Sequence, residues 1–199
     1  MNTPQTVIFI GPQGSGKGTQ ILKLKDKLQE QDPGRKVVDI QTGRRFRAMA
    51  ARGESYTEQR VADTLDTGTL QPLFLSVGLW ADAMRYYLDE SCHLLVDGFP
   101  RVVAEAQVLE SVWSFYKRDR INIINLKTPE DVVRTRMQER AREDDTETSI
   151  EERLGWYRDK VIPVIDYYRE HDRAIVYDVD GTDTVEGVHA AVISALDLQ

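Results

Sequence analysis

The amino-acid sequence predicts an α/β protein built on a parallel sheet that carries helices on both faces. The first observation is that short apolar, β-branched segments alternate along the chain with longer helical stretches, which is typical of parallel sheets. The second is that Thr6–Ile10 is apolar without a helical period, as expected of a central strand buried on both faces. We expect five strands, at Thr6–Ile10, Lys36–Ile40, His93–Val96, Ile121–Leu126 and Ala174–Asp178.

A glycine-rich turn follows the first predicted strand. Its four glycines let the backbone turn tightly and point several N–H groups at one anion, beside the positive end of the dipole of the following helix. Lys17 adds a full charge for the outer phosphates. The spacing of Gly11, Gly16 and Lys17 is that of a phosphate-binding P-loop. One departure is visible, because the usual Ser or Thr directly after the lysine is Gly18, and Thr19 comes one position later.

Length and composition limit the class of protein. With 199 residues, of which 41% are hydrophobic and 30% charged, the chain is expected to form one globular domain. The formal net charge of −7 argues against non-specific binding to nucleic acid or anionic membranes, so an anionic ligand requires a local basic cluster. No apolar run approaches the roughly 18 residues of a membrane span, and the first residues lack a signal-peptide pattern. The single Cys92 fits a buried position in a protein of the reducing cytoplasm.

Helix signals fill the chain between the strands. Thr128 as the N-cap and Pro129 at the first helical position predict a helix over residues 129–143. A further helix is expected over 149–168, with a kink at Pro163. The tryptophans lie on apolar helical stripes, and we expect all of them in the core: Trp80, Trp113 and Trp156.

The third predicted strand ends in Asp97 and is followed by Gly98-Phe99-Pro100-Arg101. A carboxylate at the end of a strand beside a P-loop is suited to hold the shell of a bound Mg²⁺. Asp97 is therefore the candidate metal residue. The residues alone leave an alternative, in which Asp97 is the N-cap of the next helix.

Several motifs together resemble those of the adenylate kinases and related nucleoside monophosphate kinases. The ending Gly18-Thr19 of the P-loop is itself the form that this family uses. Further matches follow in the family's order over essentially the whole chain, at residues 42–47, 97–101, 140–145, 152–157, 164–168 and 180–182. A match of that extent is far more specific than any single motif.

The resemblance implies reversible transfer of the γ-phosphoryl group from Mg-ATP to a nucleoside monophosphate, with Mg²⁺ as cofactor. It also implies a single kinase domain on a P-loop NTPase-type sheet, with a core of residues 1–40, 72–139 and 148–199. Segment 41–71 would be a helical insertion that binds the monophosphate, and residues 140–147 would form a short lid. Their polar composition suits mobile covers. We expect a cytoplasmic monomer that binds neither nucleic acid nor membranes.

The resemblance further assigns roles residue by residue. ATP would be bound by Gly14, Ser15, Gly16, Lys17, Gly18, Thr19, Arg136 and Arg140. The monophosphate would be bound by Thr42, Gly43, Arg47, Leu70, Gln71, Gly98, Arg101, Glu105, Arg142 and Arg153. The catalytic charges would come from Lys17, Arg101, Arg136, Arg142 and Arg153. In the lid, Asp144 and Asp145 are expected to pair with arginines.

Three positions depart from the family pattern, and all concern the acceptor site. Arg44 replaces an aspartate and adds a cation there, unless it pairs with Asp63 or Asp66. Glu105 stands where adenylate kinases have a glutamine that hydrogen-bonds adenine. A carboxylate only accepts hydrogen bonds, so Glu105 would suit the N1–H and amino group of guanine better. Gln71 stands where the family usually has a valine.

AMP remains the first choice of acceptor, which gives ATP + AMP = 2 ADP. The alternative is a kinase of the same fold for another monophosphate, namely GMP, CMP or UMP. A hypothesis of a different class is a nucleotide-binding regulator without turnover. The presence of Lys17, Asp97 and the arginines at matched positions argues against that hypothesis.

Overall fold

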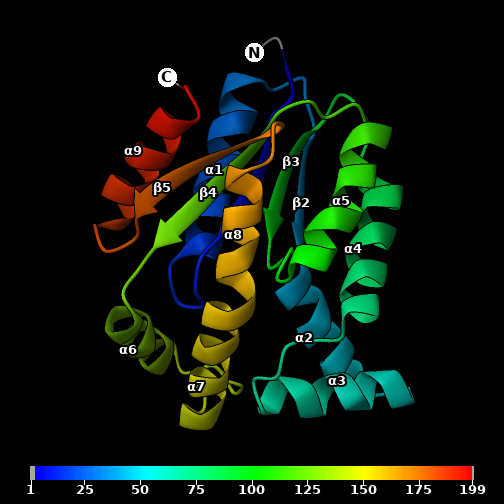
Figure 1. Ribbon diagram of the computed structural model, residues 1–199, viewed down its shortest axis with the longest axis vertical. Helices are drawn as coiled ribbons and strands as arrows, with labels where there is room; N and C mark the ends of the chain where they lie inside the picture. The colour runs from blue at the N-terminus through cyan, green and yellow to red at the C-terminus, as the bar shows by residue number, and fades with distance from the viewer. Residues whose placement is uncertain (1–2, 199) are drawn as a thin grey trace.

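The computed structural model describes residues 3–198 and contains a five-stranded sheet of order β2-β3-β1-β4-β5 (Figure 1). All neighbouring strands are parallel. The strands are β1 (Thr6–Ile10), β2 (Val37–Gln41), β3 (His93–Asp97), β4 (Ile121–Lys127) and β5 (Ala174–Asp180). Each coincides with a predicted strand to within two residues at either end. The predicted α/β fold class is confirmed.

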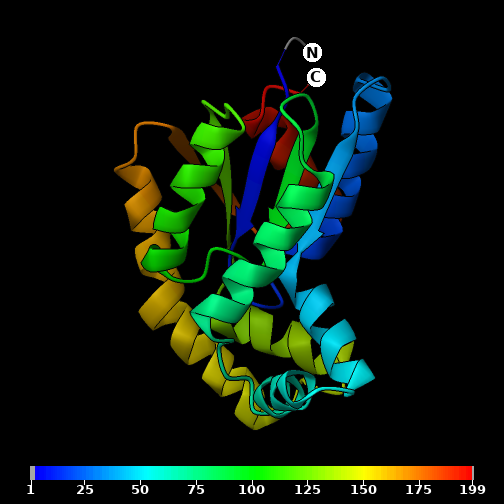
Figure 2. The same ribbon diagram turned by 90° about the vertical axis from the view of Figure 1, so that its right-hand side faces the viewer.

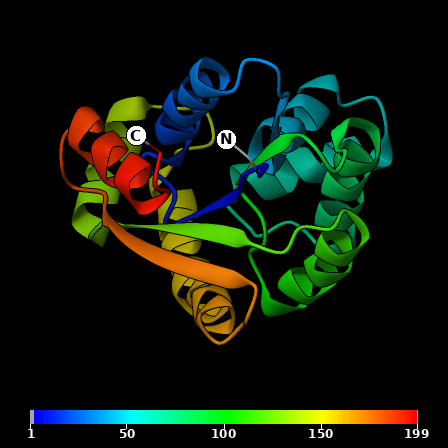
Figure 3. The same cartoon turned by 90° about the horizontal axis from the view of Figure 1, so that it is seen from above.

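Helices lie on both faces of the sheet, as the view from above shows (Figure 3). One face is covered by α1 (Lys17–Gln31) and α9 (Val185–Ala195). The other face is covered by α4 (Leu73–Tyr87), α5 (Val103–Phe115) and α8 (Ile162–Arg169). Beyond the carboxyl ends of the strands lie α2 (Thr42–Arg52), α3 (Tyr56–Asp66), α6 (Glu130–Arg140) and α7 (Glu147–Trp156). Within residues 3–198, no helix has the length and apolar character needed to cross a lipid bilayer.

The central strand β1 shows how the sheet is buried from both sides. Because side chains alternate along a strand, Val7 and Phe9 pack with α1 and α9, whereas Ile8 and Ile10 pack with α4, α5 and α8. None of these four side chains is more than 3% exposed. Since all strands run in the same direction, the loops that follow them gather at one edge, which is where ligands bind in open α/β sheets.

The helices after β4 differ from the prediction in their boundaries. Pro129 is the N-cap of α6, so the predicted capping by Thr128 is wrong. The helix ends at Arg140 because Ala141 adopts the left-handed conformation, with φ +46°. In place of a kink at Pro163, the π-helical segment η1 (Tyr157–Val161) joins α7 to α8. Pro163 lies in the first turn of α8, where its missing N–H is not needed.

Segment 41–71 contacts α7 at the carboxyl edge of the sheet. Trp156 Nε1 donates a hydrogen bond to Gly68 O at 3.0 Å, and Arg153 Nη2 donates one to Leu65 O at 3.3 Å. Figures 1 and 2 both show α3 beside α7. The predicted monophosphate segment and the helix that follows the predicted lid therefore touch, although they are far apart in the sequence.

Gly68, in the loop after α3, lies against Ser149 of α7. Its φ is +75°, and a Cβ there would lie 2.5 Å from Ser149 O and 2.8 Å from Ser149 Cα. We expect Gly68→Ala to push α3 away from α7 and to lower the melting temperature in calorimetry, at about 2–4 °C per kcal/mol for a chain of this size. Gly53→Ala is the matched control, because φ there is +62° but the nearest atom, Ala50 O, is 3.7 Å away. Equal melting temperatures for the two variants would contradict this account.

Candidate active site

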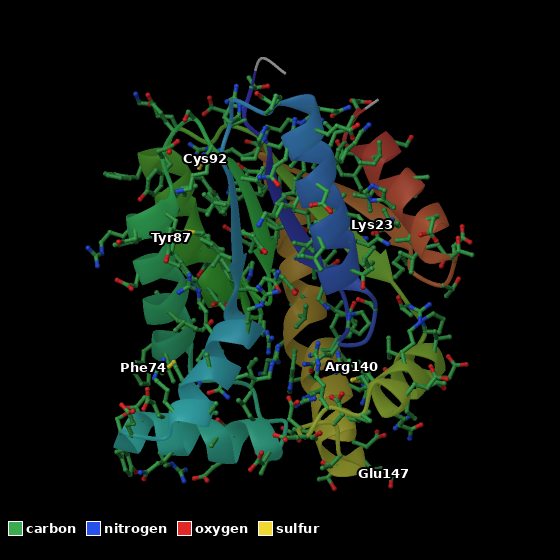
Figure 4. All side chains as sticks on the ribbon, turned by 180° about the vertical axis from the view of Figure 1, so that it is seen from behind. Lys23, Phe74, Tyr87, Cys92, Arg140 and Glu147 are labelled. Carbon is green, nitrogen blue, oxygen red and sulfur yellow. The ribbon has the colours of Figure 1, made fainter. Side chains whose placement is uncertain are left out.

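A cavity of about 630 Å³ opens at the carboxyl edge of the sheet. It lies between the loop after β1, the start of α2, the loop after β3 and the end of α6. The predicted site residues that line it are Gly14, Ser15, Gly16, Lys17, Gly18, Thr19, Gly43, Arg47, Asp97, Gly98, Arg101, Arg136, Arg140 and Arg142. Figure 4 shows Arg140 close to the start of α1, whereas Lys23 lies further along that helix.

The loop after β1 has a conformation that glycine adopts most readily. The φ angles of Gly14 and Gly16 are +90° and +94°, and a Cβ on Gly14 would lie 2.8 Å from Val133 O of α6. Gly16 is the N-cap of α1, so the first N–H groups of that helix lack partners inside it. Together with the helix dipole, these N–H groups make this end of the cavity a site for phosphate.

Lys17 folds back onto this loop. Its Nζ donates hydrogen bonds to Gly11 O at 2.9 Å and Pro12 O at 2.8 Å. Burial lowers the pKa of Lys17 to about 8; the nearby charge of Asp97 opposes this shift, whereas Arg101 and Arg140 reinforce it. The two carbonyl acceptors are neutral, so they hold the ammonium group in place without cancelling its charge.

Arg101 is fixed by the loop after β3 and by α7. Its Nε donates to Gly98 O at 2.7 Å, and its guanidinium lies 4.9 Å from the ring centre of Trp156. Burial lowers the pKa of Arg101, while Asp97 and Glu105 oppose the shift. Trp156 packs against the core, as predicted, but it is only partly buried and also lines the cavity.

The lid is held by two aspartates and two arginines, as predicted. Asp145 accepts a bidentate pair of hydrogen bonds from Arg140 at 2.9 and 2.8 Å and a further one from Arg153 Nη1 at 2.8 Å. Arg153 Nη2 lies 2.7 Å from Asp144 Oδ2. Burial alone would raise the pKa of Asp145, but hydrogen bonds from Arg140 and the charges of both arginines lower it. The carboxylate of Asp145 therefore stays ionised and holds Arg140 and Arg153.

The remaining arginines differ in their partners. Arg136 Nη1 donates to Gly181 O at 2.7 Å, in the loop after β5. Arg142 lines the cavity, and burial with the neighbouring charge of Arg140 lowers its pKa. Arg134 forms an ion pair with Glu151 and does not line the large cavity, consistent with a surface charge.

Arg44 also lines the large cavity. The predicted alternative, a salt bridge to Asp63 or Asp66, is wrong: neither is an ion-pair partner of Arg44 within residues 3–198, and Asp63 pairs with Arg60 at 2.8 Å. Arg44 thus adds a cation to the cavity at a position where the family pattern has an aspartate.

A smaller cavity of about 90 Å³ adjoins the first, and Gly98 and Arg101 line both. The other residues that line it are Phe46, Leu70, Gln71, Leu73, Ser76, Val102 and Glu105. Two predicted site residues line neither cavity. Thr42 is buried and donates to Gly98 O at 2.9 Å, and Arg153 is held by the lid aspartates.

Glu105 is fully engaged inside the protein. It is 1% exposed, and its Oε1 accepts hydrogen bonds from Ser76 Oγ at 2.6 Å and Trp80 Nε1 at 2.9 Å. Its Oε2 accepts from the backbone N of Arg101 at 2.7 Å. The carboxylate therefore joins α4, α5 and the loop after β3. The suggestion that Glu105 directs the site towards guanine is not supported.

Asp97 lies at the end of β3 and lines the large cavity. Its alternative role as an N-cap is wrong, because α5 begins only at Val103 with Val102 as its N-cap. The hydroxyl-bearing Thr19, in the first turn of α1, lines the same cavity. Carboxylate and hydroxyl oxygens are ligands that suit Mg²⁺, so these residues fit such an ion.

Sequence reasoning missed two contributions to this site. Trp156 supports Arg101 through its ring face, and Gly181 supports Arg136 through its carbonyl. The turn that contains Gly181 is visible in the sequence, but a backbone carbonyl carries no signal of its own. The apolar stripe of α7 predicted core packing for Trp156. It gave no sign that one face of the ring contacts Arg101.

The P-loop with its buried lysine and the carboxylate at the end of a neighbouring strand are typical of one class of protein, the P-loop phosphotransferases. The family model described as adenylate kinase matches residues 9–173. A protein of Corynebacterium urealyticum named adenylate kinase is 34% identical over 191 residues, which cover 96% of this chain and 98% of that protein.

Two further relatives carry the same name. The Thermus thermophilus protein is 34% identical over 200 residues, covering 98% of this chain and 99% of its own. The Cyanothece protein is 33% identical over 195 residues, covering 96% and 94%. The chain belongs to the adenylate kinase family and is a nucleoside monophosphate kinase.

The pKa of Lys17 predicts proton uptake on binding. At pH 9 the Lys17 side chain is largely neutral in the free protein, because its pKa is about 8, whereas a bound phosphate chain favours the ammonium form. We expect ATP binding at pH 9 to take up a proton and the affinity to fall as the pH rises through 8. Calorimetry in two buffers of different ionisation enthalpy measures the uptake. Lys17→Met serves as the control, and uptake of equal size in that variant would refute the assignment to Lys17.

Replacement of Glu105 by glutamine is predicted to destabilise the protein, because the carboxylate accepts three hydrogen bonds. In Glu105→Gln the NH₂ group must face either the Arg101 backbone N–H or the pair formed by Ser76 and Trp80. The Ser76 hydroxyl can turn to accept a hydrogen bond, but both N–H groups only donate, so one of them loses its acceptor. We expect a loss of about 1–3 kcal/mol in unfolding free energy and no gain in preference for AMP over GMP. Thermal melting and kcat/KM for both acceptors measure these effects, with the exposed Glu170→Gln as control. Unchanged stability together with a shift in acceptor would show that Glu105 reads the base.

Proposed function

We propose that this protein catalyses reversible transfer of the γ-phosphoryl group from Mg-ATP to AMP, giving two ADP. The observation that carries this proposal is the junction of two cavities. The larger contains the P-loop and Lys17, the smaller is lined in part by segment 41–71, and Arg101 lines both. ATP in the larger cavity and a monophosphate with its base in the smaller one would bring the two phosphates together at Arg101.

The chain would supply position and charge to this reaction. An oxygen of the acceptor phosphate attacks the γ-phosphorus, the bond to the β–γ bridging oxygen breaks, and ADP leaves, so no general base is required. Lys17 and the N–H groups of the P-loop would hold the ATP phosphates. Arg47 and Arg101 would hold the acceptor phosphate. Cations fixed before the reaction stabilise the charge that spreads over the phosphoryl oxygens in the transition state.

Mg²⁺ would be held by the ATP phosphates, by water and by the oxygen donors of the large cavity. Asp97 would act through the water bound to the ion, and Thr19 stands beside the P-loop. When bound, the ion neutralises charge on the β- and γ-phosphate oxygens. The arginines then have fewer negative charges to balance.

We further propose that segment 41–71 and the lid 140–147 close over the nucleotides, while residues 1–40, 72–139 and 148–199 act as one core. The contacts of α7 with Leu65 and Gly68 support this closure. Arg142 in the lid lines the cavity and would reach the transferring phosphoryl group. Arg136, held by Gly181 O, would act with it, and Arg140 would also contact ATP. Arg153 would contribute its charge from behind Asp144 and Asp145.

We also propose that the enzyme works as a monomer in the cytoplasm. One chain brings the P-loop lysine and the predicted acceptor arginines together in one cavity, which supports a site that works in a single copy. The single cysteine, Cys92, is buried, which suits a reducing compartment.

A coupled assay of ADP release tests the reaction. We expect AMP to stimulate turnover more than GMP, CMP, UMP or dTMP. Lys17→Ala is expected to lower kcat by at least about 100-fold, the order found when a charge-stabilising donor is removed. Lys23→Ala is the matched control, because Lys23 lies on α1 outside the cavity and pairs with Glu186. The proposal fails if no acceptor stimulates turnover, and the role of Lys17 fails if its variant keeps near-normal activity.

A further inference from the structure

Trp156 contacts two segments that lie far apart in the sequence. It is the last residue of α7, and it lines the large cavity while packing in part against the core. The face of its ring lies against the Arg101 guanidinium, whose central carbon is 4.9 Å from the ring centre. The edge of the ring carries Nε1, which donates a hydrogen bond to Gly68 O at 3.0 Å. One side chain of α7 therefore contacts both the loop after β3 and segment 41–71.

The ring and one carbonyl hold the Arg101 guanidinium. Its Nε donates to Gly98 O at 2.7 Å. Its Nη1 and Nη2 groups have neither a hydrogen bond nor an ion pair in the part of the chain that the structure describes. A guanidinium that stacks on an aromatic ring is held through its flat face, so the N–H groups at its edge stay free. Both Nη groups of Arg101 are therefore available to a phosphate.

The hydrogen bond to Gly68 restricts the rotation of the indole ring. An indole has one N–H donor, at one edge of the ring, so an acceptor on a neighbouring segment limits the directions in which the face can point. A second hydrogen bond ties the same two segments, because Arg153 Nη2 of α7 donates to Leu65 O at 3.3 Å. If segment 41–71 moved away from α7, the hydrogen bond of Trp156 would break and its ring would be free to turn.

Core packing alone does not account for both contacts of Trp156. Trp113 provides the comparison, because it is 0% exposed and its Nε1 has no hydrogen-bond partner among residues 3–198. Packing is therefore sufficient to explain Trp113. Trp156 is instead only partly buried, and it uses both its ring face and its N–H in contacts with other segments.

We propose that Trp156 is a positioning residue, which aligns the Arg101 guanidinium for phosphoryl transfer while segment 41–71 lies against α7. This inference rests on the proposed function, in which segment 41–71 closes over the acceptor and Arg101 holds the acceptor phosphate. The guanidinium is held from two sides when the segment is closed, and by Gly98 O alone when the ring is released. Trp156 thus couples closure of the acceptor segment to the placement of a catalytic charge.

Two replacements of Trp156 separate its two contacts. Trp156→Phe keeps a ring face behind Arg101 but has no N–H for Gly68 O, whereas Trp156→Leu removes both contacts. In Trp156→Leu we expect kcat to fall by about 10-fold, because the guanidinium loses its support, and KM for AMP to rise. In Trp156→Phe we expect kcat to stay within about 3-fold of the wild type and KM for AMP to rise by about 5-fold, because one hydrogen bond that closes the segment is lost. KM for ATP should be unchanged in both variants.

A double-mutant cycle tests whether Trp156 acts through Arg101. Arg101→Lys replaces the planar guanidinium with an ammonium group that does not stack on the ring in the same way. In that background Trp156→Leu should lower kcat by less than about 2-fold. Trp113→Phe is the matched control, because it changes a buried tryptophan that lines neither cavity. It should lower the melting temperature and leave kcat and both KM values unchanged.

The outcomes distinguish failure of this inference from failure of the proposed function. Near-normal kinetics of Trp156→Leu, or an equal fall in kcat with and without Arg101→Lys, would overturn the role of Trp156 and leave transfer to AMP intact. Calorimetric titration with AMP measures the acceptor affinity without turnover, and an unchanged affinity in Trp156→Phe would contradict the coupling through Gly68 even if Trp156→Leu does not fold. A wild type that AMP does not stimulate would overturn the proposed function and this inference with it.

Discussion

Repulsion among cations in one cavity is the constraint on which the site depends. The large cavity is lined by Lys17, Arg44, Arg47, Arg101, Arg136, Arg140 and Arg142, against the two carboxylates Asp97 and Asp183. This concentration occurs in a chain with a net charge of −7. Burial is the main cause of the lowered pKa values of Lys17, Arg101 and Arg142, and the charges of neighbouring arginines lower each of them further. Such a cluster is unfavourable when empty and becomes favourable once phosphate chains enter it.

The fold holds three of these seven cations with backbone carbonyls that follow the ends of strands. Gly11 O after β1 binds Lys17, Gly98 O after β3 binds Arg101, and Gly181 O after β5 binds Arg136. A carbonyl fixes a cation without neutralising it, so the charge remains available to a substrate. In the lid the choice is the opposite, because Asp145 binds both Arg140 and Arg153. Arg140 and Arg153 are thus held by a charge with which a phosphate must compete, whereas Lys17, Arg101 and Arg136 are held by neutral groups that can remain bound to them.

The fold class and the P-loop residues of the large cavity could be predicted from the sequence. Strands such as Thr6–Ile10 are predictable because burial on both faces demands an unbroken apolar run. Helix ends were less predictable, since the end of α6 depends on the left-handed Ala141, a conformation without a residue signature. The contact of Trp156 with Arg101 was missed for a similar reason: a side chain that packs one face on the core and offers the other to Arg101 has the same sequence pattern as a core residue.

Glu105 shows why a single departure from a family pattern does not decide specificity. Its chemistry, taken alone, pointed to guanine, because a carboxylate accepts and never donates. Inside the fold this capacity is used by Ser76, Trp80 and the Arg101 backbone, so the residue stabilises the wall of the small cavity. A wall residue that is fully bonded cannot distinguish ligands, whereas one with an unsatisfied atom can. By that criterion Glu105 does not select the acceptor base.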